Sequence, residues 1–138
     1  MMPSSRLVAR IDFLGTGNAF SPPGRMHALA LLDGSVMVDA PPTALIQLRR
    51  AGISPADLNH LLITHWHADH TFGFPFILLE RKYISDPGSE RALRVHLRPG
   101  GRELLGRLCR TGFPGSLDDA LESGVAWSES ESSELAGT

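Results

Sequence analysis

The stretch "LLITHWHADHTFG", residues 61–73, gathers candidate metal ligands within six positions: His65, His67, Asp69 and His70. It contains three of the six histidines of the chain. The residues "HLLIT", 60–64, form a compact apolar run that is typical of a buried strand. The ligands therefore follow at the carboxyl end of that strand. Histidines two apart on an extended chain project to the same side, so we expect His65 and His67 to reach one ion.

The ligand types indicate the chemistry. Imidazole and carboxylate suit zinc, with manganese or iron as alternatives, and the absence of cysteine from the stretch excludes a closed cysteine site. Without metal, the crowded imidazoles would repel one another when protonated and would lose hydration when neutral. A catalytic zinc site keeps one position open for water and lowers the pKa of that water toward about 7. If a helix begins here, Asp69 and His70 would face a second metal, roughly 3.5–4 Å from the first.

Composition bounds the remaining classes. The chain has 138 residues, enough for one modest domain, and its net charge of -2 gives no strong nucleic-acid signal and no attraction to anionic lipid. The single cysteine, Cys109, excludes an internal disulfide and lies in an apolar pattern that predicts burial. No stretch approaches the ~20 apolar residues of a membrane span. We therefore expect a cytoplasmic protein without a membrane segment.

Strand and helix patterns alternate along the chain, which predicts an α/β or α+β fold. The expected strands are residues 6–15, two strands around the turn Asp33-Gly34, residues 60–64, residues 91–97 and a strand from 125. The expected helices cover residues 42–52, 71–84, 99–110 and 117–124, and Gly73 and Pro75 are expected to delay or bend the start of the second. The acidic Ser/Glu segment "SESESSELAGT", 128–138, predicts a disordered tail after a domain of residues 1–127.

The motif resembles a known signature. "THWHADH", residues 64–70, has the pattern H-x-H-x-D-H of the metallo-β-lactamase superfamily. "IDFLGTGNAFSPPGRMHALALLDG", 11–34, resembles the opening of ribonuclease Z and its relatives. Residues 36–65 resemble the segment that carries the strand-end aspartate, a helix and the motif strand, and residues 93–115 resemble the strand and helix after the motif. The resemblance spans residues 6 to about 127.

The resemblance implies a role for each motif residue. His65 and His67 would bind a first zinc, and Asp69 and His70 a second. Asp69 would also handle the proton of the attacking water. Asp39, at the end of "VMVD", would orient a ligating imidazole without touching the metal.

The resemblance also implies a substrate loop, "GTGNAF", residues 15–20. Gly15 and Gly17 would allow unusual backbone angles and close approach of a substrate. Thr16 and Asn18 would donate hydrogen bonds to it. The reaction implied is attack of a metal-bound hydroxide on a phosphodiester, ester or amide, and the likeness to ribonuclease Z favours a phosphodiester.

The chain departs from the pattern downstream of the motif. Members of the superfamily supply two further histidines and a bridging aspartate from later strands, whereas only His96 follows the motif here, within a strand at a non-ligand position. His27 and His60 are likewise expected to be ordinary histidines. We therefore expect the N-terminal half of an αββα sandwich, truncated. It is either a fragment, or a chain completed by its own copy or by another chain, or a reduced fold without catalysis.

Two functions remain open from the sequence. The first is a zinc-dependent hydrolase acting on a small-molecule or phosphodiester substrate. The second is a catalytically incomplete fragment that acts as a metal-binding or interaction module. A di-iron oxidoreductase of the same superfamily usually has glutamate at the position of His67, so this histidine favours hydrolytic metals.

Overall fold

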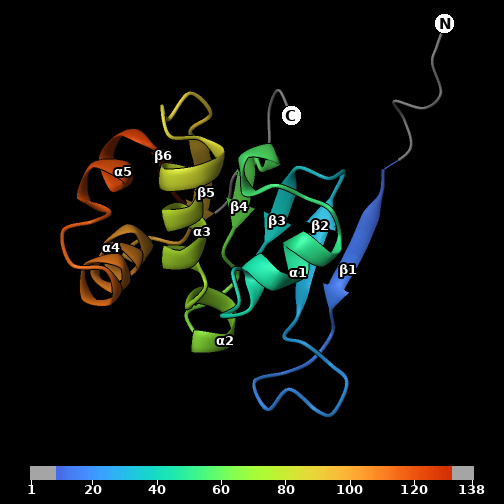
Figure 1. Cartoon of the computed structure of the whole chain (residues 1–138). Coiled ribbons are helices and arrows are strands. Elements are labelled where there is room, and N and C mark those ends of the chain that lie inside the picture. Colours follow the sequence, from blue (N-terminus) through green and yellow to red (C-terminus); the bar gives the residue numbers. More distant parts are fainter. Residues whose placement is uncertain (1–8, 132–138) are drawn as a thin grey trace, which may run out of the picture.

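The sheet follows the order of the chain in the computed structural model, which describes residues 9–131 (Figure 1). Its six strands lie in the order β1-β2-β3-β4-β5-β6. They are β1 (Ile11–Gly15), β2 (Leu29–Leu32), β3 (Val36–Val38), β4 (His60–Leu62), β5 (Leu93–Leu97) and β6 (Val125–Glu129). The first three strands pair antiparallel, and β3 to β6 pair in parallel. The mixed α/β class predicted from the sequence is confirmed.

Helical segments connect the parallel strands. They are α1 (Ala44–Arg50), η2 (Pro55–Asp57), α2 (Ala68–Thr71), α3 (Phe74–Glu80), η3 (Arg81–Ser85), α4 (Gly101–Gly112) and α5 (Asp118–Ser123). Crossovers between parallel strands are right-handed, and here each one advances in the same direction along the sheet. The main helices α1, α3, α4 and α5 therefore cover one face of the sheet (Figure 1). Within residues 9–131, no helix is long and apolar enough to cross a membrane.

The tight turn between β2 and β3 confirms the predicted hairpin. Asp33 and Gly34 both have positive φ, 51° and 71°, and the Ser35 N–H donates to the Leu32 carbonyl at 3.1 Å. Two left-handed central residues define a type I′ turn, whose twist matches that of the strands it joins. Aspartate and glycine tolerate these angles.

The core lies between the sheet and its helices. Alternate residues of the strands point toward the helices, as Leu61 and Val95 do, and both side chains are fully buried. Leu48 of α1 and Leu105 of α4 pack into the same cluster. Cys109 belongs to it as predicted, and its burial raises the pKa of the thiol to about 12.

The opposite face of the sheet lies outside the core. Strand register places one set of side chains on it: Ile11, Phe13, Ala30, Leu32, Val36, Val38, His60, Leu62, Arg94, His96, Ala126 and Ser128. None of these residues belongs to the core cluster. Ile11 is 55% exposed and Phe13 70% exposed, whereas Val36, His60 and His96 on the same face are buried. We call this set the open face.

The structure changes several of the predicted boundaries. β6 extends through Ser128 and Glu129, which the tail prediction had included, because Glu129 pairs with Leu97 of β5. The helix expected over residues 71–84 starts late, as Gly73 and Pro75 predicted: α2 ends at Thr71, α3 begins at Phe74, and η3 follows it. β1 begins at Ile11 rather than at residue 6. Residues 6–8 of the predicted first strand and 132–138 of the predicted tail lie outside the described residues.

Candidate metal centre

The predicted ligands follow β4 at the edge of the sheet where β3 also ends. Val38 of β3 pairs with Leu62 of β4, so the segments that follow these two strands leave the sheet side by side. His67 has an extended backbone with φ -60° and ψ 148°, and α2 begins directly after it. The change from strand to helix expected at this point is therefore present. In parallel sheets, ligands bind outside such carboxyl strand ends.

The imidazole rings of the motif form one cluster. The ring centroids of His65 and His70 are 3.9 Å apart, and those of His65 and His67 are 4.7 Å apart. His67 is exposed, whereas the other two are half-buried. The structure thus brings together the three histidines that the spacing singled out.

Asp39 lies behind this cluster and is 5% exposed. Its Oδ2 is 2.7 Å from His70 Nδ1 and accepts a hydrogen bond from the Thr64 hydroxyl at 2.7 Å. Its Oδ1 accepts from the Thr64 N–H at 2.7 Å. Asp39 thus contacts one imidazole of the motif, that of His70, and its role in orienting a metal ligand stays a prediction.

Asp69 lies on the other side of the His70 ring, with Oδ2 3.2 Å from Nε2. A neutral imidazole donates from one nitrogen only. With Nδ1–H donated to Asp39, His70 Nε2 and the Asp69 carboxylate face each other as two acceptors. Two facing acceptors repel each other unless a proton or a cation lies between them. His70 Nε2 and the Asp69 carboxylate are therefore suited to binding a divalent cation.

The motif residues suit a metal ion in the type of their ligand atoms and in their closeness to one another, but their side chains do not form a coordination shell. Within residues 9–131, no group of three or more His, Cys, Asp or Glu side chains is arranged so that it could hold a metal ion. Metal binding by the motif residues His65, His67, Asp69 and His70 therefore stays a prediction.

Backbone hydrogen bonds attach the motif helix to the chain after β3. The Ala40 N–H donates to the His70 carbonyl at 2.8 Å, and the Gly73 N–H donates to the Ala40 carbonyl at 2.8 Å. The buried Thr71 hydroxyl donates to the His67 carbonyl at 3.1 Å. These contacts hold α2 against Asp39, and they fix the positions of Asp39 and Asp69 relative to the His70 ring.

The glycines of the predicted substrate loop serve the packing of the chain. Neither Gly15 nor Gly17 has a positive φ, so the unusual backbone angles expected for them are not found. A Cβ at Gly15 would overlap the His27 carbonyl and the Gln47 amide, and the Gly17 N–H donates to the Met26 carbonyl at 2.7 Å. The close approach is thus made by the protein's own chain.

The polar residues of that loop behave differently from each other. Asn18 accepts a hydrogen bond from the Phe20 N–H at 3.0 Å through its side-chain oxygen, and Thr16 is exposed. Substrate contacts by Thr16 and Asn18 remain a prediction.

Two histidines outside the motif form a pair that sequence reasoning missed. His60 Nδ1 and His96 Nε2 are 2.9 Å apart between β4 and β5, and both residues are buried. Burial lowers the pKa of each imidazole, and the nearby charge of Arg94 lowers both further. The sequence signal was present but weak, because both residues lie in apolar strands whose register is known only from the fold.

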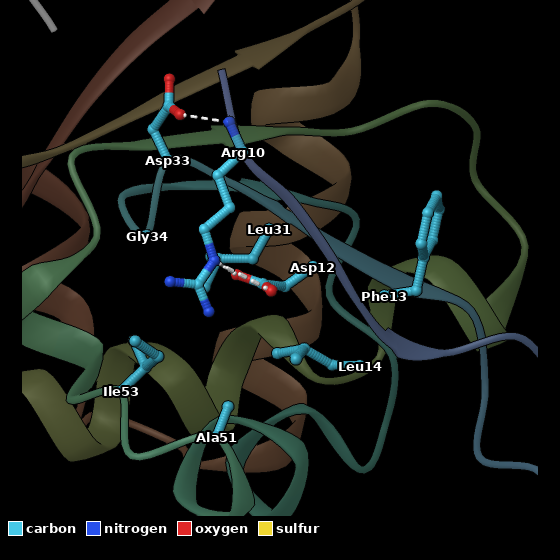
Figure 2. Close-up of a pocket in the computed structure, with 9 residues that line it drawn as sticks. All are labelled: Arg10, Asp12, Phe13, Leu14, Leu31, Asp33, Gly34, Ala51 and Ile53. Atoms are coloured by element: carbon cyan, nitrogen blue, oxygen red, sulfur yellow. Dashed lines mark hydrogen bonds and ion pairs between the residues drawn. The ribbon is translucent and has the colours of Figure 1, made fainter. Parts of the chain in front are cut away.

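A cavity of about 600 Å³ lies away from the motif (Figure 2). Its lining includes Arg10 just before β1, Asp33 in the turn between β2 and β3, and Ile53 between α1 and η2. Arg10 projects into it and donates from Nε to Asp12 at 3.2 Å (Figure 2). None of the predicted site residues lines this cavity, so it is separate from the candidate metal centre.

Comparison with known proteins agrees with this architecture. The model of the family described as Anti-Pycsar protein Apyc1 matches residues 9–98, more than half of the chain. Ribonuclease Z of Pyrobaculum calidifontis is 33% identical over 109 residues, which cover 76% of this chain and 36% of that protein.

Solved structures show the same fold at low identity. Human tRNase Z, short form, superposes with a TM-score of 0.69 at 22% identity, over 88% of this chain and 44% of that one. A diphosphatase from the PhnP family superposes with a TM-score of 0.65 at 22% identity, over 94% and 54%. The chain therefore spans about a third of that curated relative and about half of these structures. The predicted half of a metallo-β-lactamase fold is confirmed.

Proposed function

The chain belongs to the family described as Anti-Pycsar protein Apyc1 and is a ribonuclease Z-like member of the metallo-β-lactamase superfamily, and from this membership we propose that it is a metal-dependent hydrolase. The observation that carries the proposal is the cluster of three imidazoles and two carboxylates at the ends of β3 and β4. Zinc is the ion that we propose, up to two per site, with manganese or iron as substitutes. We place the enzyme in the cytoplasm, because its single cysteine is buried and unpaired.

The residues have distinct roles in this proposal. His65, His67, Asp69 and His70 would hold the metal. A divalent cation lowers the pKa of water bound to it and neutralises charge that develops on the substrate. Asp69 would accept the proton of the attacking water, because its carboxylate lies beside His70 Nε2, across the ring from Asp39. Asp39 would hold that ring from behind.

A phosphodiester is the substrate class that we propose. The relatives are named as a ribonuclease and a diphosphatase, and both names describe cleavage at phosphorus. The net charge of the chain gave no such indication, yet residues 91–110 contain six arginines and one glutamate. All six arginines are exposed. A local basic segment of this kind attracts phosphate groups even where the whole-chain charge does not.

Metal content and phosphodiesterase activity test the proposal together. We expect dialysed protein to retain zinc by inductively coupled plasma mass spectrometry and to hydrolyse bis(p-nitrophenyl) phosphate. His67→Ala should lose most of the metal, and Asp69→Asn should lower the rate by at least about 100-fold. Asp118→Asn is the matched control, since Asp118 is exposed and outside the cluster. Zinc retained equally by His67→Ala would refute the ligand assignment.

A second candidate function is that of a metal-binding or interaction module. The observation that favours it is the open face, on which Phe13 is 70% exposed. An apolar sheet face of this kind is suited to a completing chain or a second copy of the same chain. This reading gains support if the protein binds zinc but does not hydrolyse the diester.

A further inference from the structure

The Thr64 hydroxyl lies between Asp39 and His65. Its Oγ1 is 2.7 Å from Asp39 Oδ2 and 3.0 Å from His65 Nδ1. A carboxylate only accepts hydrogen bonds, so the hydroxyl must donate its one proton to Asp39. The hydroxyl oxygen is then an acceptor toward the imidazole, which requires His65 to carry its proton on Nδ1.

The consequence concerns the atom that His65 presents. A neutral imidazole with its proton on Nδ1 has its lone pair on Nε2. The same Asp39 oxygen lies 2.7 Å from Nδ1 of His70, and this contact selects the same tautomer there. The Asp39 carboxylate therefore sets the tautomer of two imidazoles, that of His70 directly and that of His65 through the Thr64 hydroxyl.

Thr64 is itself held at two points. Its N–H donates to Asp39 Oδ1 at 2.7 Å while its hydroxyl donates to Oδ2. The Asp39 N–H continues the pairing of β3 and β4 by donating to the Leu62 carbonyl at 2.7 Å. The branched side chain of threonine restricts χ1, so the hydroxyl is fixed between its partners.

We propose that Thr64 is a positioning residue that holds His65 with Nε2 free for the metal, relaying the effect of Asp39. The inference rests on the proposed function in that His65 is taken as a ligand. The tautomer itself is a property of the metal-free protein. It can therefore be measured whether or not the chain is an active hydrolase.

Two variants separate the hydroxyl from the shape of the side chain. Thr64→Val keeps the branched shape and removes the hydroxyl, whereas Thr64→Ser keeps the hydroxyl. The first measurement is heteronuclear NMR of the imidazole nitrogens in metal-free protein at about pH 7.5. The second is zinc affinity by competition with a chelator. Circular dichroism confirms that each variant is folded.

We expect His65 to carry its proton on Nδ1 in the wild type and in Thr64→Ser, and to lose that preference in Thr64→Val. His70 should keep its tautomer in all three proteins, because Asp39 contacts it directly. Zinc affinity should fall about 10- to 100-fold in Thr64→Val, as for other residues that orient a ligand. Thr64→Ser should restore affinity to within about threefold.

The outcomes distinguish the two proposals. If His65 carries its proton on Nε2 in the wild type, or if Thr64→Val leaves its tautomer unchanged, the positioning role is refuted even when zinc binds. If the tautomer responds as expected but the wild type binds no zinc, the positioning role stands and the metal-dependent function fails. If Thr64→Val does not fold, an altered His65 tautomer in folded Thr64→Ser overturns the role and an unaltered one supports it.

Discussion

At the residue scale, the single side chain of Asp39 contacts several groups behind the motif. It has a left-handed backbone with φ 68°, and its carboxylate receives the Thr64 N–H, the Thr64 hydroxyl and His70 Nδ1. Aspartate and asparagine both tolerate this backbone. Asp39→Asn therefore keeps the backbone and the size of the side chain but replaces one acceptor oxygen with a donor.

We expect Asp39→Asn to lower the free energy of unfolding by about 1–3 kcal/mol, because a buried acceptor is lost and its partners are left unmatched. Zinc affinity should fall as well, by about 10- to 100-fold. Urea denaturation and a chelator competition measure the two effects. Unchanged stability in the variant would contradict the assignment of Asp39 as the centre of this network.

The closeness of the motif residues to one another could be predicted from the sequence, whereas their hydrogen-bond partners could be predicted only in part. His65, His67, Asp69 and His70 stand in one short segment, so their neighbourhood follows from local geometry. Thr64 is inside the same segment, but its contact with Asp39 joins residues 25 apart in sequence and depends on the pairing of β3 with β4. At Gly15 the sequence does not distinguish close packing of the chain from close approach of a substrate, and the structure shows the first.

At the element scale, the attachment of α2 depends on Gly73. Its N–H donates to the Ala40 carbonyl at 2.8 Å, and a Cβ at this position would overlap the Pro41 carbonyl. We expect Gly73→Ala to lower the free energy of unfolding by about 1–3 kcal/mol through this overlap. Gly112→Ala is the matched control, since a Cβ there meets nothing within 4 Å. Thermal denaturation of the two variants, compared with the wild type, should separate them.

The pairing of β4 with β5 makes stability depend on pH through His60 and His96. Burial lowers the pKa of both imidazoles in the folded chain, and the charge of Arg94 lowers them further. The unfolded chain takes up protons near its ordinary pKa of about 6.5, where the folded chain does not. The free energy of unfolding is therefore expected to be highest above about pH 7.5 and to decline as the pH falls below about 6.5.

A double variant tests this pH dependence. His60→Val with His96→Val removes both titrating groups and suits strand positions. Urea denaturation at about pH 7.5 and about pH 5.5 should show a smaller loss of stability in the double variant than in the wild type. An equal loss in the two proteins would show that this pair is not the source of the pH dependence.

The elements were predicted better than their limits. All six strands were predicted, the first from alternation, the next two from apolar runs around the turn Asp33-Gly34 and the fourth from a continuous apolar run. The end of β6 was missed because Ser128 and Glu129 are polar, and only the partner strand shows that they pair. The late start of the helix after the motif was predicted from Gly73 and Pro75, whereas the contact of Gly73 with Ala40, far away in sequence, was not.

At the scale of the whole molecule, the arrangement of helices determines which surface is left apolar. Right-handed crossovers in one direction put the main helices on one face of the sheet, and the chain spans about half of its structural relatives. The open face could not be predicted from the sequence, because its residues are identified only by the register of the strands.

The exposed part of the open face predicts association between copies of the chain. Ile11 and Phe13 project from β1, at the edge of the sheet, and the only charged residue on the face is Arg94. Two such faces can pack on each other about 10 Å apart without burying a carboxylate. We expect sedimentation velocity to show a concentration-dependent dimer for the wild type.

A matched pair of variants tests the face itself. Phe13→Ser should shift the protein toward the monomer, because it removes the largest exposed side chain of the face. Phe20→Ser is the control: Phe20 is 90% exposed but lies in the loop after β1 and outside the face. A monomeric wild type at all concentrations, or an equal effect of the two substitutions, would mean that copies of the chain do not associate through this face. Because the candidate metal centre lies at the ends of β3 and β4, zinc content should be the same in monomer and dimer unless the partner copy adds a ligand.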